Sequence, residues 1–424
     1  MTNAVQTKKN AGGRKSRPVM LCALFLFLAG AAGALDFGMV LNQEAKASNE
    51  IAGSGKTVNP GFFYTPVLRP WVSGPLGSRL NLYLSGSLSF DYEKDRWRAP
   101  AALPQLDRSE LTWLVSPALS FTLGRQHLED PSTLAASGLF DGLSGNFSAG
   151  GGRFTAGAYY SGFLYKKQAD ILMTGRDQSG YAQAISSAAD YFASRRVLAS
   201  FKWENPGLGP SSSLALGLLG QFDLNEGDDR LHSQFFSYRF GQRLPGGFSI
   251  ERAFSLGMEE KQGELFRVAL AGLVRVNWLI PEGLDDRLGF RVVYSSHDFN
   301  ERLGPFIPVN SLPQGQVFSP AIGSMVVFKL DYSLRILQTL SLGAEGSYFI
   351  RLDTQTFRDN GEPDALKDTG NFLGGEFFGT AFWTPLPDVA LTFGGGAFFP
   401  RLGNAFIPEA KIRWKTVLGL ILSF

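Results

Sequence analysis

The sequence of 424 residues predicts an all-β protein, folded as a transmembrane antiparallel β-barrel of about sixteen strands, within a range of about 14 to 18. Two observations predict this fold. Side-chain character alternates with period two in most segments after residue 76, as in strands that have one apolar and one polar face. The connections between these segments are alternately short and long, which is the topology of single-chain bacterial barrels.

The N-terminal segment has the pattern of a Sec-type signal peptide, which would comprise residues 1–34. Several cations precede a continuous apolar run, Val19–Leu35, which ends in the small residues Ala32-Gly33-Ala34 before the cleavage site. A single N-terminal anchor helix is the alternative, but no charged stop follows the run. The only cysteine, Cys22, lies in the signal, so the mature chain would have neither disulfides nor thiolate chemistry.

Residues 35–76 do not alternate clearly, and Pro66, Pro70 and Pro75 argue against strand structure there. We expect this segment to be a periplasmic extension or a partial plug of the lumen, and residues 77–424 to form the barrel. The expected strands are 77–92, 108–116, 118–126, 139–149, 152–165, 191–205, 211–224, 232–244, 247–259, 263–280, 287–298, 321–336, 338–352, 371–384, 388–400 and 409–424.

The connections support a membrane barrel over a soluble β-sandwich or repeat protein, because neither of those predicts alternating loop lengths. In hydrocarbon each unpaired N–H or C=O group costs several kcal/mol, so a sheet that crosses a bilayer has to close on itself. The connections at 225–231 and 260–262 are of middling length. The longer ones are 93–107, 127–138, 166–190, 299–320, 353–370 and 401–408.

The last sixteen residues, Glu409–Phe424, alternate in character and end on an aromatic residue. Such a strand resembles the terminal signal strand of bacterial outer-membrane barrels. The resemblance implies a location in the outer membrane, contact with its lipid, and insertion by the barrel-assembly machinery. The residues expected to carry the assembly signal are Trp414, Leu420, Leu422 and Phe424.

Strand parity separates a lipid face from a lumen face. A charge that faced lipid near the midplane would cost about 2–4 kcal/mol, so charged residues on strands are assigned to the lumen. Inward cations outnumber inward acids about two to one, which predicts an aqueous pore that favours anions; cations that merely pair with acids across the lumen are the alternative. Arg252 shares the lipid parity, which indicates a bulge or an interfacial position. The expected pathway residues are Arg239, Arg243, Arg267, Arg275, Arg291, Lys329, Arg335, Arg351, Lys411 and Arg413.

The connection 166–190 is the longest external loop, and Tyr181–Ala193 in and beyond it could form a short helix. The loop at this place in general porins folds into the lumen and narrows it. By analogy of position and length, the same is expected here, with a plain surface loop as the alternative.

Residues 118–163 contain Gly124-Arg125-Gln126 at the end of one strand and Phe140-Asp141-Gly142-Leu143 at the start of the next. This arrangement resembles one hairpin of the alginate-export and related substrate-specific porin families. The resemblance implies a monomeric barrel, usually of eighteen strands, with an arginine-lined lumen that passes anionic sugars or other small anions. It also implies an ion pair between Arg125 and Asp141; without the family, a surface pair at the barrel rim is expected.

No enzyme site is expected. The histidines are His127, His232 and His297, and neighbouring residues around His297 point to opposite faces of a strand, so they cannot form a triad. The sequence also predicts no metal site, no cofactor and no nucleic-acid partner. The expected function is passive diffusion of small hydrophilic, preferentially anionic solutes. The alternatives are a plugged transporter of hydrophobic, fatty-acid-type ligands and a surface adhesin that binds through loops such as 299–320.

Overall fold

The computed structural model describes residues 35–49, 61–93, 96–97, 102–227, 229–261, 266–281, 283–299, 302–354, 357 and 366–424. The expected signal peptide, residues 1–34, lies outside this part of the chain. None of the helices in these ranges has the length and apolar character needed to cross a membrane.

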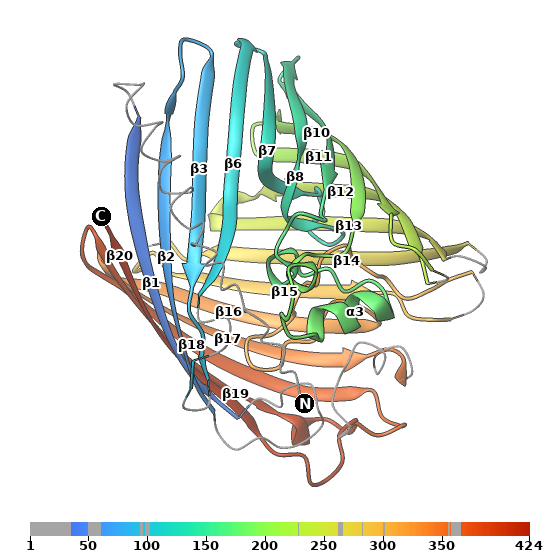
Figure 1. Cartoon of the computed structure of the whole chain (residues 1–424). Coiled ribbons are helices and arrows are strands. Elements are labelled where there is room, and N and C mark those ends of the chain that lie inside the picture. The colour runs from blue at the N-terminus through green and yellow to red at the C-terminus, as the bar shows by residue number, and fades with distance from the viewer. Residues whose placement is uncertain are drawn as a thin grey trace, which may run out of the picture.

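The described residues form a single antiparallel sheet of twenty strands. Two of them, β4 (Tyr92–Glu93) and β5 (Arg96–Trp97), have two residues each and pair with each other as a small hairpin. The other eighteen form a closed barrel, because β1 pairs with β20 (Figure 1). They are β1 (Asp36–Ser48), β2 (Gly61–Pro75), β3 (Leu80–Ser89), β6 (Leu103–Ser116), β7 (Leu119–Glu129), β8 (Ser137–Ala149), β9 (Gly152–Tyr160), β10 (Arg196–Gly209), β11 (Ser212–Asp223), β12 (Leu231–Arg243), β13 (Phe248–Lys261), β14 (Arg267–Leu279), β15 (Arg287–Ser295), β16 (Met325–Leu337), β17 (Leu340–Arg351), β18 (Phe372–Leu386), β19 (Val389–Phe399) and β20 (Arg413–Ser423).

Each of the sixteen expected strands has a counterpart among β3 and β6–β20, but the count of sixteen is wrong. The two further strands, β1 and β2, come from the segment 35–76 that was expected to be an extension or a plug. The eighteen strands implied by the resemblance to substrate-specific porins are therefore present in the described residues.

The prolines of β2 explain why its sequence does not read as a strand. β2 pairs without interruption with β1 from Gly61 to Ser73. On its other side the pairing with β3 runs through Leu68, is interrupted at Arg69 and Pro70, and resumes at Trp71. A proline lacks the N–H that a ladder needs, so Pro70 lies where the ladder to β3 is already broken.

Successive strand connections lie alternately at a short-turn end and a long-loop end of the barrel. In length there is an exception, because the connection 262–266 at the long-loop end is shorter than the connection 280–286 at the short-turn end. The connections of middling length, between β11 and β12 and between β13 and β14, both belong to the long-loop end. Both chain ends of the barrel lie at the short-turn end, where the N–H of Met39 donates to the carbonyl of Phe424 (3.0 Å) and the N–H of Phe424 donates to the carbonyl of Met39 (2.9 Å).

The outer face of the barrel is apolar. Large side chains such as Phe201, Leu218 and Leu330 are about half exposed, whereas Leu219 and Val327 on the opposite parity are buried. A continuous belt of this kind is far larger than the apolar patches of soluble monomers and is the lipid-facing surface of a membrane barrel.

The parity assigned from the sequence to β14 and β16 is correct, since Val274 and Phe328 are exposed and Lys329 is buried on the inner side. Arg252 lies on the outer parity and is exposed, as the sequence indicated. The pairing of β13 with both neighbours is continuous through Arg252, so there is no bulge. Arg252 follows the start of β13 by four residues and occupies an interfacial position near the short turns.

Candidate solute pathway

The inner wall of the barrel has two zones. Towards the long-loop end it is apolar, and residues such as Phe140, Leu198 and Phe235 form one buried core with Ile171 and Phe306 from the long loops. Towards the short turns the wall is polar and more accessible. The long loops therefore fold into the barrel and cover the apolar zone, while the polar zone stays open to the lumen.

The loop 296–324 crosses the interior. The N–H of Ile307 donates to Glu259 of β13 (3.1 Å), and the N–H of Val309 donates to the carbonyl of Ala135 between β7 and β8 (2.7 Å). Further along, Glu376 of β18 accepts three consecutive N–H groups of the loop, from residues 316–318 (2.7–2.9 Å). These anchors lie in three separate sectors of the barrel, so the loop spans the lumen.

Asn310 joins this crossing loop to two others. Its Oδ1 accepts the N–H of Ser137 (3.2 Å), and its Nδ2 donates to the carbonyl of Ala169 (2.7 Å). The next N–H, of Ser311, donates to the carbonyl of Asp170 (2.7 Å). Asn310 is buried. Described residues of the loops 130–136, 161–195 and 296–324 are thus connected to one another inside the barrel.

The loop 161–195 contains α2 (Lys166–Ala169), α3 (Gly175–Ala182) and the 3-10 turn η1 (Ala189–Tyr191). The helix expected over Tyr181–Ala193 is wrong in its extent. A capping box between Thr174 and Asp177 starts α3 early.

A local turn replaces the rest of the expected helix. Asp190 accepts hydrogen bonds from the backbone and side chains of Ser186 and Ser187, and such bonds compete with helical ones. The same bonds lower the pKa of Asp190 to about 2, and the bonds from Ser186 have the largest effect on this pKa. Ile171 and Met173 are buried in the core, so the loop folds inward and is not a plain surface loop.

Four charged residues line up on the inner face of neighbouring strands. In the strand register, Glu251 of β13 lies opposite Arg275 of β14. Arg275 in turn lies opposite Arg291 of β15, and Arg291 lies opposite Lys329 of β16. Lys329 forms an ion pair with Glu345 (3.0 Å). Within the described residues neither arginine has a carboxylate at ion-pairing distance, although Glu251 is the cross-strand partner of Arg275. Arg275, Arg291 and Lys329 thus form a cationic row on the inner wall.

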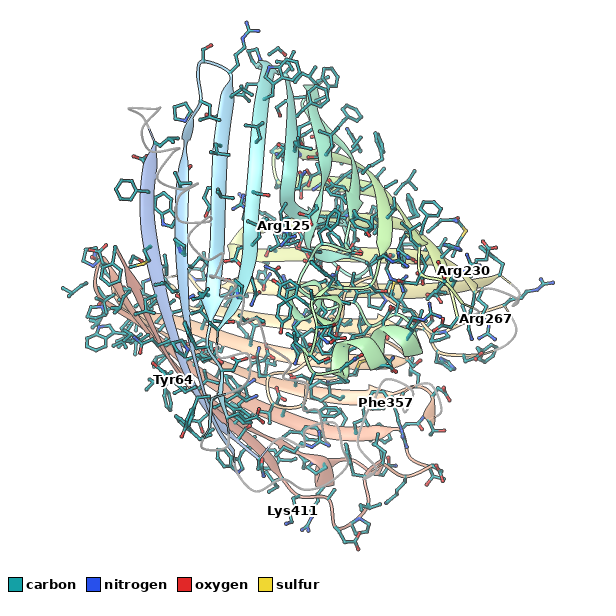
Figure 2. The ribbon with its side chains drawn as sticks, in the orientation of Figure 1. Tyr64, Arg125, Arg230, Arg267, Phe357 and Lys411 are labelled. Carbon is teal, nitrogen blue, oxygen red and sulfur yellow. The ribbon has the colours of Figure 1, made fainter. Side chains whose placement is uncertain are left out.

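Four expected pathway residues lie near the two ends of the barrel. Arg267 pairs with Asp298 at the long-loop end (3.1 Å), and Arg335 pairs with Asp285 at the short-turn end (3.4 Å). Arg267 and Lys411 lie at the margin of the barrel (Figure 2). Arg243 is exposed at the end of β12, next to the short turn.

Arg239 lies on the inner side of β12 and lines a hollow of about 710 Å³ at the short-turn end. The same hollow includes Arg153, which forms an ion pair with Glu204 (2.8 Å). This hollow is a second cation-bearing part of the inner wall, on strands other than those of the cationic row.

The remaining two expected residues bind loops. Arg351 is fully buried, and its guanidinium donates to the carbonyls of Lys367, Thr369 and Gly370 (2.7–3.0 Å). The guanidinium of Arg413 lies 5.2 Å from the ring centre of Phe318, in the crossing loop. These two arginines contact loops and hold them against the wall.

The expected pair between Arg125 and Asp141 is present and bidentate, with Nε to Oδ1 at 2.9 Å and Nη2 to Oδ2 at 2.8 Å. On β7 and β8 the two residues have the same parity as the exposed Leu123 and Leu143. The pair therefore lies on the outer face of the barrel. The Arg125 side chain is only 4% exposed, so the pair is not a surface pair at the rim.

Sequence reasoning missed the residues that fasten the loops. Glu259 and Asn310 gave no signal, and strand parity assigned Glu376 to the inner face without indicating a loop contact. Their partners are backbone groups far away in the chain. Strand parity did place Arg196 on the inner side, but its complete burial under loop 161–195 depends on tertiary contacts.

No protein-family model and no curated protein matches the chain. Among solved structures, it is similar to OccK2 (OpdF) of Pseudomonas aeruginosa, with a TM-score of 0.60 and 13% identity over 92% of this chain and 98% of that one. It is also similar to OccK9 (OpdG) of the same organism (TM-score 0.58, 16% identity, 92% and 98% covered) and to the outer membrane protein opdK of the same organism (0.59, 12%, 92% and 98%). At these identities the likeness concerns the fold, and the chain therefore has the closed, porin-like β-barrel fold of the Occ outer-membrane proteins.

Proposed function

We propose that this protein is an outer-membrane porin through which small hydrophilic, preferentially anionic solutes diffuse passively. The observation that carries the anion preference is the cationic row Arg275–Arg291–Lys329, in which the two arginines form no ion pair within the described residues. Fixed cations on the wall of a low-dielectric channel raise the local concentration of anions. No bond is made or broken in this function, so no catalytic residue is assigned.

The inward loops supply the selectivity by size. A loop that crosses the lumen and is fastened to three sectors of the wall leaves a narrower passage than the bare barrel. Solutes would pass this constriction and then the charged zone near the short turns. We further propose export by the Sec pathway, removal of residues 1–34 and insertion by the barrel-assembly machinery.

The alternative of a transporter plugged by residues 35–76 loses its basis, because β1 and β2 belong to the barrel wall. An adhesin that binds through loop 299–320 is disfavoured by the inward contacts of that region, including those of Ile307 and Val309.

Conductance in planar bilayers tests the proposal. The purified protein should give steady channels whose reversal potential in a KCl gradient lies towards that of chloride. Replacing both arginines of the row, Arg275→Gln with Arg291→Gln, should move the reversal potential towards that of potassium. Arg252→Gln, which removes a cation from the outer wall, is the matched control and should change nothing. A folded barrel that conducts no ions would contradict the proposal.

A further inference from the structure

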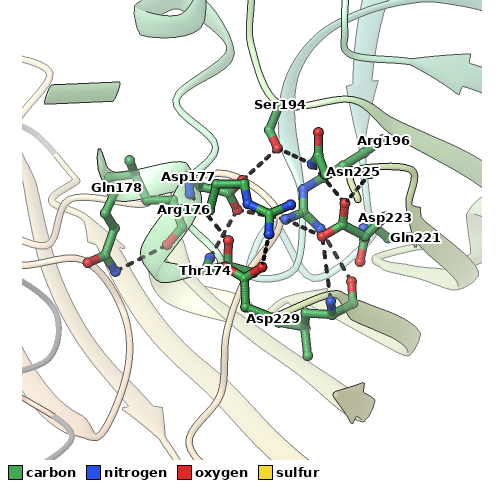
Figure 3. A network of polar contacts seen from close by, with 12 residues as sticks. Thr174, Arg176, Asp177, Gln178, Ser194, Arg196, Gln221, Asp223, Asn225 and Asp229 are labelled. Atoms are coloured by element: carbon green, nitrogen blue, oxygen red, sulfur yellow. Dashed lines mark hydrogen bonds and ion pairs between the residues drawn. The ribbon is translucent and has the colours of Figure 1, made fainter. Parts of the chain in front are cut away.

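A buried polar network fastens α3 to the inner wall of the barrel (Figure 3). Its centre is Arg196, the first residue of β10, which is fully buried. Nη2 of Arg196 donates to Oδ2 of Asp177 in α3 (2.6 Å) and lies 3.2 Å from Oδ2 of Asp223 at the end of β11. Nη1 donates to the carbonyl of Leu231 at the start of β12 (3.3 Å). One guanidinium thus connects the loop to three strands.

The carboxylate that binds Arg196 also defines the start of α3. Oδ2 of Asp177 accepts the N–H of Thr174 (2.9 Å), and the N–H of Asp177 donates to Oγ1 of Thr174 (3.2 Å). Oδ1 of Asp177 accepts the hydroxyl of Ser194 (2.5 Å), just before β10. One carboxylate therefore both caps the helix and anchors it to the wall.

The other end of α3 is also held. Nζ of Lys166 donates to the carbonyls of Gly180 (2.8 Å) and Gln183 (2.5 Å), which belong to the last turn of the helix and its C-cap. Lys166 is buried, and this burial lowers the pKa of its amine. Asn225 extends the network to the neighbouring loop, since its Nδ2 donates to Ser194 and Asp223 (both 2.7 Å).

Burial separates this network from ordinary surface pairs. Arg196 and Asp177 are both 0% exposed, whereas Arg176 and Asp229, which join the same helix to the loop 224–230, are 40% and 38% exposed. An exposed pair contributes little because water competes for it. Removing Arg196 would leave the buried carboxylates of Asp177 and Asp223 without their cation, and removing the charge of Asp177 would leave Arg196 with Asp223 as its remaining partner in the network. Either change weakens a buried pair and favours opening of the site.

We propose that Arg196 and Asp177 form a latch that positions loop 161–195 and so sets the width of the channel. The inference rests on the proposed porin function for its effect on current. With the latch closed, α3 stays against β10–β12 and the passage has one width. With the latch broken, α3 leaves the wall, enters the lumen and returns, and the passage changes width repeatedly. Arg196 and Asp177 are positioning residues that need not touch a solute.

Single-channel recording in planar bilayers measures the effect on width. The protein as it stands should show one steady current level, and both Arg196→Met and Asp177→Asn should show transitions between levels. Arg176→Gln is the matched control, because it removes an exposed pair from the same helix, and it should keep the steady level. Steady single-level currents from both latch variants would overturn the proposal.

A spin label measures the latch without any current. The only cysteine of the sequence is Cys22, so a protein that lacks residues 1–34 and carries Ser179→Cys has one labelling site, on the exposed side of α3. The mobility of the label should be higher with Arg196→Met or Asp177→Asn than in the parent protein. Equal mobility in all three proteins would contradict the latch.

Single-channel current and spin-label mobility test the porin function and the latch separately. A parent barrel that is folded but silent contradicts the porin function, while the label still decides on the latch. Asp177→Asn retains the shape of the side chain and its bond with Ser194, so it serves if Arg196→Met does not fold.

Discussion

Arg125 and Asp141 form a bidentate ion pair on the outer wall of the barrel, where lipid would surround a lone charge. The guanidinium also donates to the carbonyls of Leu106 (2.6 Å) and Phe163 (3.0 Å), at the start of loop 161–195. All the charge is therefore satisfied by protein groups. The pair joins β6, β7 and β8 and the base of that loop at a single point.

Asp141→Ala should destabilise the barrel by about 3 kcal/mol, because it leaves the buried guanidinium of Arg125 without its counter-charge. Urea unfolding in lipid vesicles measures the change. Glu204→Ala is the control: it breaks the pair with Arg153, whose side chain is 58% exposed, and should cost about 1 kcal/mol or less. Equal losses from the two substitutions would contradict the assigned role of the buried pair.

Glu376→Gln should free one end of the crossing loop. The carboxylate accepts three backbone N–H groups, and an amide would turn a donor towards at least one of them, at a cost of about 2 kcal/mol. Hydrogen exchange of the peptide that covers residues 313–320 should become faster. Glu345→Gln, which removes the partner of Lys329, is the control and should leave that peptide protected. Unchanged exchange with Glu376→Gln would show that other contacts hold the loop.

Deletion of Phe424 should impair closure and assembly of the barrel. Its backbone makes two hydrogen bonds with Met39, which extend the seam between β20 and β1 to the end of the chain. The fraction of heat-modifiable barrel in outer membranes measures assembly. Phe424→Leu keeps the backbone bonds and removes the aromatic ring, so a loss with this variant too would assign the signal to the side chain. A normal yield of folded barrel after the deletion would refute the role of Phe424.

Tyr181 should stay protonated well into the alkaline range. Burial, together with the charge and hydrogen bond of Asp170, raises the pKa of Tyr181 from 10.0 to about 12. A raised pKa means that the folded loop prefers the phenol, so this contribution to stability is complete below pH 10 and lost as the pH approaches about 12. The difference in phenolate absorbance between the parent and Tyr181→Phe measures the titration. A midpoint near pH 10 would show that Tyr181 is exposed to water.

The sequence alone determined sixteen of the eighteen strands in the wall of this barrel. In a strand the side chains alternate between the two faces, so apolar residues that face lipid alternate with polar residues that face the lumen. Each strand segment carries this period-two record in its own sequence. That record located β3 and β6–β20, assigned Lys329 to the inside, and placed Arg252 on the outer parity. The alternation of connections was equally local, and it indicated the two ends of the barrel before any contact was known.

The tertiary structure decided what occupies the inside. The sequence did not reveal β2, because a proline such as Pro70 argues against a strand unless the ladder beside it is broken. That break lies in the pairing between β2 and β3 and is known only from the folded structure. Arg196, Arg275 and Arg351 have the same inward parity, yet Arg275 lines the lumen and the other two are buried by loops. Which cation a solute can meet depends on loops that cross the barrel and bond to residues far away in the chain. Such long-range contacts leave no periodic trace in the sequence, and only the folded protein establishes them.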